Sequence, residues 1–283
     1  MINAISITTS NRYPGGGDVP VILAENYIAA RGITDPNHQA YLYAFNEELI
    51  NGGLVNTDGT STYIKALYLY GGTQATAAGH KWNFMNPVDT DAAFRETYFG
   101  GLTQNSNGIT GNAIDAYIDP HFSHSDFAGQ DDCHIMTYIR DNQSPSGLQA
   151  AYGAIASSFN GTRMFPKYNG TTMLNALFGS TGGGVANTDS SGLWITTRTG
   201  SGNQPIYRNG SSFGLIGNSS SSIPTASIKG LCVDYNNSQI IYQYSSYNIC
   251  ARGYGNGLSS TESAAYSSAL NTYFTTLGIN IYT

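Results

Sequence analysis

The chain has 283 residues, of which 40% are hydrophobic and only 11% charged, with 34 glycines and 21 tyrosines. Globular domains usually carry about 25% charged residues, so neutral polar groups must cover much of this surface. The net charge of −6 argues against a nucleic-acid partner, because phosphate contacts depend on clustered Lys and Arg. No segment approaches the ~20 consecutive apolar residues of a membrane span, so we expect no membrane insertion.

The chain begins with a predicted arm and glycine-rich joint over residues 1–19. Alternating apolar residues from Ile2 to Ile7 pass into Arg12–Gly17, which contains a proline and three glycines and cannot hold regular structure. A basic region followed by an apolar run, the mark of a Sec-type signal, is missing from this start. We therefore expect assembly in the cytoplasm of the cell that makes the protein.

Residues 20–60 are predicted to form a helical hairpin. Asp18 and Pro20 open a first helix that runs to about Arg31. Thr34-Asp35-Pro36 opens a second helix, which Asn51-Gly52-Gly53 ends. Two short helices joined by a tight turn are expected to pack side by side.

Residues 61–283 are predicted to form an antiparallel β-sandwich with a C-terminal helix. Between Thr97 and Thr261 the sequence has no glutamate and abounds in turn formers, which favours strands over helices. Asn-Gly pairs, which favour tight hairpins, lie between short apolar runs at residues 160–161, 169–170 and 209–210. Near the end, Ser259 and Glu262 form a predicted capping box, and Gly278 ends the helix that follows.

Several segments resemble known proteins. The runs Leu193–Arg198 and Ile206–Gly210 resemble the strand, turn and Tyr-x-Asn-Gly signature of concanavalin A-like jelly rolls of the laminin-G type. The tail from Ile249 through the closing helix resembles the last strand and terminal helix of the same group. Asp89–Arg95 followed by Phe99–Gly101 is similar to segments in virion proteins of tailed phages, notably crAss-like phages. The resemblance covers roughly residues 63–283 and implies a mainly β, concanavalin A-like jelly roll.

This resemblance implies a structural virion component of a tailed bacteriophage. The expected protein is a head or tail fibre or capsid-decorating protein with a lectin-like jelly roll, located in the virion. Its expected partners are sister subunits in a homotrimer, other virion proteins bound through the N-terminal region, and host surface polysaccharide as a candidate ligand. The alternatives are a carbohydrate-binding lectin module without a virion role and a polysaccharide hydrolase or lyase.

The spacing of Glu and Asp residues indicates whether the chain could be a hydrolase of this fold. Laminarinase-type hydrolases share the jelly-roll architecture and carry two Glu and one Asp at alternating positions of one strand. No glutamate lies between Thr97 and Thr261, and the adjacent Asp131 and Asp132 would point to opposite faces of a strand. The segment Gly210–Gly214 matches the G-x-S-x-G pattern, but no histidine follows Ser212. We therefore predict no catalytic residues and a protein that is not an enzyme.

One local cluster has side chains suited to a divalent metal. It contains His121, His124 and Asp126, with Asp119, Asp131 and His134 nearby. The alternative is a polar loop between two strands. We predict no metal and no cofactor, and the question of a metal at His121, His124 and Asp126 stays open.

Ligand-binding residues are less well indicated. Trp194 and the many tyrosines are candidates for stacking on sugar rings, yet the sequence singles out no site. The cysteines Cys133, Cys232 and Cys250 have no paired spacing and are predicted to be reduced core thiols.

Overall fold

The structure, a computed structural model, describes residues 21–143, 147–156, 160–179, 183–221, 225–235 and 240–280. The predicted arm over residues 1–19 lies outside them. The helices are α1 (Ile22–Arg31), α2 (Pro36–Asn51), α3 (Ala77–His80) and α4 (Ser260–Thr276), with short 3₁₀ turns η1 (Asp91–Ala93) and η2 (His124–Asp126). Within the described residues, no helix is both long and apolar enough to span a bilayer.

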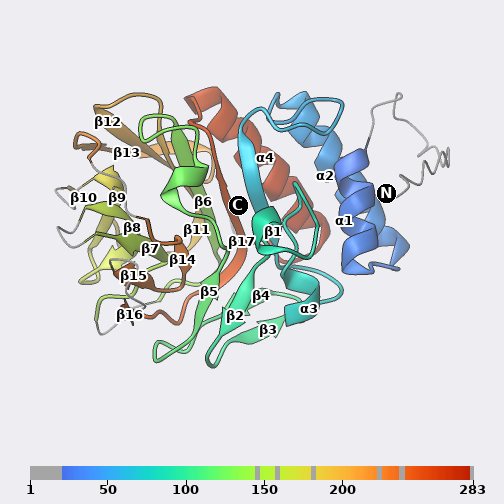
Figure 1. The fold of residues 1–283 in the computed structure, drawn as a ribbon, viewed down its shortest axis with the longest axis horizontal. Helices are drawn as coiled ribbons and strands as arrows, with labels where there is room; N and C mark the ends of the chain where they lie inside the picture. Colours follow the sequence, from blue (N-terminus) through green and yellow to red (C-terminus); the bar gives the residue numbers. More distant parts are fainter. Residues whose placement is uncertain are drawn as a thin grey trace.

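Two sheets and a helical layer build the molecule (Figure 1). The eight-stranded sheet has the order β13-β12-β11-β6-β17-β4-β3, with β1 also paired to β17. Its strands are β1 (Ile64–Leu69), β3 (Thr103–Asn105), β4 (Gly108–Thr110), β6 (Cys133–Ile139), β11 (Gly192–Arg198), β12 (Asn203–Arg208), β13 (Ser211–Gly217) and β17 (Asn248–Gly255).

The nine-stranded sheet has the order β10-β9-β8-β7-β14-β5-β2, with β15 paired to β7 and β16. Its strands are β2 (Thr97–Phe99), β5 (Tyr117–Asp119), β7 (Tyr152–Ile155), β8 (Gly161–Tyr168), β9 (Thr172–Gly179), β10 (Gly184–Ala186), β14 (Lys229–Gly230), β15 (Val233–Tyr235) and β16 (Ile240–Tyr242). All pairings are antiparallel except β15 with β7. The predicted mainly β, jelly-roll-like sandwich with helices near both ends is confirmed.

Apolar residues fall into two large clusters, one on each side of the eight-stranded sheet. The first lies between the two sheets and includes Ile118, Tyr152 and Trp194. The second lies between the eight-stranded sheet and the helices, where Leu42 and Leu270 meet Ile195. Because α1, α2 and α4 cover one face of that sheet and the other sheet covers its second face, its central strands β6 and β11 are buried and closed to large ligands.

The helix boundaries follow local sequence signals. The Asp35 side chain accepts hydrogen bonds from the first turn of α2, and Pro36 takes the first helical position, where a missing N–H costs nothing. Ser259 and Glu262 form the predicted capping box of α4. The first helix begins at Ile22 in the structure, and Gly32 ends it in the left-handed conformation as expected.

The hairpins also follow local signals. Asn169-Gly170 joins β8 to β9 and Asn209-Gly210 joins β12 to β13, and all four residues have positive φ. The third pair differs, because Asn160 precedes β8 and Gly161 already belongs to that strand. The hairpin at Asn209 places Ser212 on β13, so the G-x-S-x-G match belongs to a strand–turn–strand unit and not to a nucleophile elbow.

The outer face of the nine-stranded sheet is the one the helices leave uncovered (Figure 1). A small apolar cluster around Phe165 and Val233 occupies part of it. The remainder is formed by β2, β5 and β14, and it carries the exposed aromatic residue Phe99.

Candidate functional site

Three aromatic side chains form a partly exposed group, here called the aromatic platform, composed of Phe99, Tyr117 and Tyr244. Phe99 and Tyr117 face each other across β2 and β5, with ring centroids 4.6 Å apart and planes within 8° of parallel. Tyr244 lies 6.5 Å from Tyr117. Their neighbours in the strands, such as Ile118, point into the core, so alternation directs the platform outward.

Exposure sets the platform apart from the other aromatic pairs. Phe99 keeps 39% of its surface exposed, and nearby Ile114 keeps 74%. Among the described residues, Phe99 is the one aromatic side chain in the group of large exposed hydrophobic residues, and soluble proteins rarely leave contiguous apolar surface without a use. β2 also ends the sheet, so one edge of the platform is open.

Polar groups flank the platform. In the loop before β5, the Asp115 carboxylate accepts hydrogen bonds from Asn112 Nδ2 at 2.7 Å and from the Gly101 N–H at 3.1 Å. These donors hold the pKa of Asp115 below its usual value, so this exposed group is negatively charged at neutral pH. Along β2, the Thr97 hydroxyl lies 2.9 Å from His121 Nε2. Sugar hydroxyls are bound in proteins by such side chains placed beside an aromatic face.

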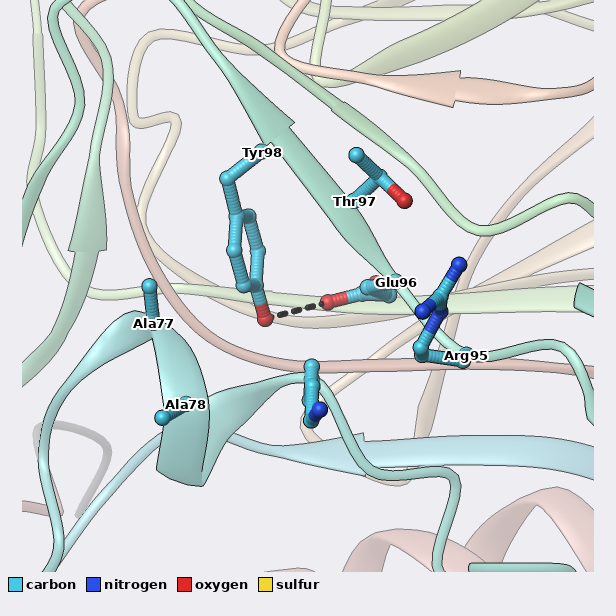
Figure 2. Close-up of a pocket in the computed structure, with 7 residues that line it drawn as sticks. Ala77, Ala78, Arg95, Glu96, Thr97 and Tyr98 are labelled. Atoms are coloured by element: carbon cyan, nitrogen blue, oxygen red, sulfur yellow. Dashed lines mark hydrogen bonds between the residues drawn. The ribbon is translucent and has the colours of Figure 1, made fainter. Parts of the chain in front are cut away.

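The other side of β2 borders a hollow of about 390 Å³, which Figure 2 shows. Ala77 and Ala78 of α3 lie across from Tyr98, and Arg95 stands at one end. Lys81 and Arg95 both pair with Asp89, at 2.6 and 3.2 Å. These pairs are partly exposed, so solvent screening leaves them little energetic weight.

A buried polar cluster lies under this hollow. Glu96 accepts hydrogen bonds from Tyr70 at 2.6 Å and Tyr98 at 3.0 Å, and Arg252 lies 3.3 Å away from it. Burial raises the pKa of Glu96 to about 7, although the Arg252 charge opposes that rise. Since the Glu96 side chain is fully closed to solvent, the cluster supports the inter-sheet core and does not face a ligand.

The histidine loop does not converge on one point. His121 lies near Thr97 and Asp91. His124 packs edge-on against Phe178 at 4.8 Å, and burial lowers its pKa to about 3. The Asp126 carboxylate caps its own turn through Ser123. Among the described residues, no group of three or more His, Cys, Asp or Glu is arranged to hold a metal.

Other predicted candidates take core positions. Trp194 is 1% exposed and packs between the sheets against Phe213, so it is closed to sugars. His134 is buried, with Nδ1 2.5 Å from the Asn256 carbonyl oxygen. The prediction of reduced core thiols is confirmed, because all three cysteines are buried and unpaired.

Sequence reasoning missed two features of this face. The platform pairs residues of two short strands whose register a sequence does not reveal, and Phe99 was noted only as part of a resemblance. The structure also brings Asp119 and Asp234, far apart in the chain, to the same lysine, Lys229. Sequence spacing relates only carboxylates that are close in the chain, so it gives no signal for this pair.

Comparisons with known proteins give the fold. No protein family and no curated protein matches the sequence. Among solved structures, a Trypanosoma rangeli sialidase mutant with trans-sialidase activity is similar with a TM-score of 0.55 and 10% identity, over 83% of this chain and 39% of that one. The Trypanosoma rangeli sialidase in complex with 2,3-difluorosialic acid is similar with a TM-score of 0.54 and 11% identity, over the same shares. The receptor-binding domain of botulinum neurotoxin type G follows with a TM-score of 0.47 and 14% identity, over 74% and 52%.

These likenesses correct one prediction. The conclusion that the chain is not an enzyme is contradicted, because the solved structures that it resembles over most of its length are sialidases, which are enzymes. The absence of glutamate between Thr97 and Thr261 argues against one catalytic arrangement of carboxylates. It does not bear on other catalytic arrangements. At 10% identity, and with the chain spanning 39% of the sialidase, the likeness shows the β-sandwich fold alone.

Proposed function

We propose that this chain is a carbohydrate-binding β-sandwich that holds glycans on the aromatic platform. The observation that carries the proposal is the exposed, parallel stack of Phe99 on Tyr117 at the open margin of the uncovered sheet face. Aromatic faces bind the apolar faces of sugar rings, while neighbouring amides, hydroxyls and carboxylates orient the sugar hydroxyls. Thr97, Asn112 and Asp115 supply those groups here.

The expected ligands are neutral glycans. Asp115 is exposed and ionised beside the platform, and the nearby cations Lys81 and Arg95 are already paired with aspartates. An acidic sugar would be repelled by Asp115, and these two cations of the described residues are held by aspartates, whereas a neutral sugar would accept or donate hydrogen bonds.

A glycan array with the folded protein tests this function. The wild-type protein should retain neutral oligosaccharides, and Phe99→Ala and Tyr117→Ala should each weaken binding about tenfold or more, equivalent to about 1.4 kcal/mol. Leu215→Ala is the matched control, because Leu215 is 56% exposed but lies on β13 of the other sheet. Failure of the wild-type protein to bind any glycan, or unchanged binding by both platform variants, would refute the proposal.

The biological setting that we propose is the virion of a tailed phage. In this setting the sandwich is a fibre or capsid-decorating module, the N-terminal region attaches it to other virion proteins, and the ligand is host surface polysaccharide. Support comes from the resemblance of residues 89–101 to segments of tailed-phage virion proteins, and the strand–turn segments near Trp194 resemble laminin-G type jelly rolls, which fits a lectin-like module. Light scattering should then give three times the chain mass of 30.1 kDa, and a monomer at micromolar concentration would contradict the trimer.

A further inference from the structure

A lysine and an aspartate lie directly opposite each other on adjacent strands of the uncovered sheet face. The pairing of Gly230 with Ile118 makes Lys229 of β14 and Asp119 of β5 the next opposed pair. Lys229 Nζ contacts Asp119 Oδ2, and the two side chains retain only 10% and 14% of their exposure. The reactive atoms of an amine and a carboxyl group therefore meet in a place with little access to water.

The second oxygen of Asp119 is held by two donors. Ser227 Oγ donates to Asp119 Oδ1 at 2.6 Å, and the His121 N–H donates to the same oxygen at 2.9 Å. Burial works against ionisation of Asp119, but Lys229 and these donors together hold its pKa below the usual value. Two fixed donors on one carboxyl oxygen also match the arrangement that stabilises an oxyanion when a nucleophile adds to the carboxyl carbon.

A third residue completes the group. Asp234 Oδ2 lies 3.9 Å from Lys229 Nζ, and Asp234 is 4% exposed. Within the described part of the chain, no group donates a hydrogen bond to Asp234 Oδ1, which is an expensive state for a buried carboxylate oxygen. Burial raises the pKa of Asp234, with Lys229 opposing. A carboxyl group in this state can accept a proton from the amine and give one back.

We propose that Lys229 and Asp119 form an intramolecular isopeptide bond, with Asp234 moving the protons. The Lys229 ammonium first gives one proton to Asp119 Oδ2, which it contacts, leaving a neutral amine and a carboxylic acid. Nζ then adds to Asp119 Cγ, and the negative charge that develops on Oδ1 is held by Ser227 and the His121 N–H. Asp234 takes a second proton from the nitrogen and delivers it to Asp119 Oδ2. The Nζ–Cγ bond forms, the Cγ–Oδ2 bond breaks, and Oδ2 leaves as water. An ammonium and a carboxylate thus become an amide and one water molecule, with no oxidant, reductant or cofactor.

The bond would tie β5 to β14 covalently. The two strands otherwise share a short ladder, since β14 has only two residues, Lys229 and Gly230. The cross-link would fasten this ladder beside the aromatic platform.

Intact mass spectrometry of the denatured full chain tests the inference without any glycan, so its result is independent of the proposed function. The wild-type chain should be lighter than its sequence mass by one water molecule. Lys229→Arg and Asp119→Ala should each restore the full mass, and Asp234→Ala should restore most or all of it. Lys81→Arg, which alters a more exposed lysine–aspartate pair, should keep the loss. Digestion should give one branched peptide that joins the Asp119 and Lys229 segments.

The outcomes separate clearly. A wild-type chain at its full sequence mass would overturn the inference, even if every variant failed to fold. A loss of water that persists in Lys229→Arg would also overturn it, because the dehydration would then lie elsewhere, for example at an Asn-Gly succinimide. If the Asp234→Ala chain lost one water molecule as completely as the wild-type chain, the proposed role of Asp234 would be refuted.

Discussion

Protonation of Glu96 couples to folding. Its pKa moves from 4.5 to about 7 because burial disfavours the charged form. Between these values the native state keeps a proton that the unfolded chain has released, so stability falls as pH rises through this window. The loss for this one group is up to about 3 kcal/mol.

A Glu96→Gln variant isolates that contribution. Gln cannot titrate, so urea unfolding at pH 5 and pH 8 should show wild-type stability falling relative to the variant by up to about 3 kcal/mol. The comparison with Gln is needed because four buried histidines shift stability in the opposite direction: burial lowers the pKa values of His38, His80 and His134 to about 4 and that of His124 to about 3. If the difference in unfolding free energy between wild type and variant were the same at pH 5 and pH 8, the raised pKa of Glu96 would be contradicted.

Residue contacts of this kind could not be predicted from the sequence. The Glu96–Arg252 pair joins the residue just before β2, at the margin of one sheet, to β17 of the other sheet, and the Asp119–Lys229 pair depends on the register of β5 with β14. Both require knowledge of which strands are neighbours, and composition and periodicity do not supply it. The sequence alone therefore relates each carboxylate only to residues that are close to it in the chain.

At the scale of elements, the β12–β13 hairpin shows why local signals worked where they did. Asn209 and Gly210 both have positive φ, which the two-residue turn demands and which Asn and Gly tolerate best. The same is true of the α4 capping box, since both of its partners lie within one turn. The two Asn-Gly turns at 169–170 and 209–210 and the α4 capping box follow from adjacent residues, whereas the short strands β2, β5 and β14 had too few residues to show a period.

The Gly210→Ala variant tests this reasoning. Alanine at φ +78 is strained, and its Cβ would lie 3.3 Å from Ser267 of α4, so we expect a loss of about 1–2 kcal/mol. Gly202→Ala is the matched control in the preceding turn, because its Cβ would meet open space without positive φ. Differential scanning calorimetry should show a clearly lower Tm for Gly210→Ala. For the control, the unfolding free energy should change by no more than about 0.5 kcal/mol, so its Tm should stay close to that of the wild type. Equal Tm losses for the two variants would refute the account of the turn.

At the scale of the whole molecule, the layer order decides where a ligand can bind. Helices cover one face of the eight-stranded sheet and the second sheet covers the other, which leaves the outer face of the nine-stranded sheet. The sequence predicted the sandwich and its terminal helices, but it did not predict which sheet the helices would cover. That choice rests on apolar residues from α1, α2 and α4 meeting β6 and β11.

Glycan binding at the aromatic platform is the central claim. Hydrogen–deuterium exchange with and without a bound neutral oligosaccharide tests this binding most directly. Ligand should slow exchange at the amides of residues 97–101 and 112–119, which carry Phe99, Asp115 and Tyr117. Residues 193–198 of the closed sheet should exchange at the same rate with and without ligand and provide the internal reference. Protection confined to the helical layer, or spread over segments away from β2 and β5, would contradict the account.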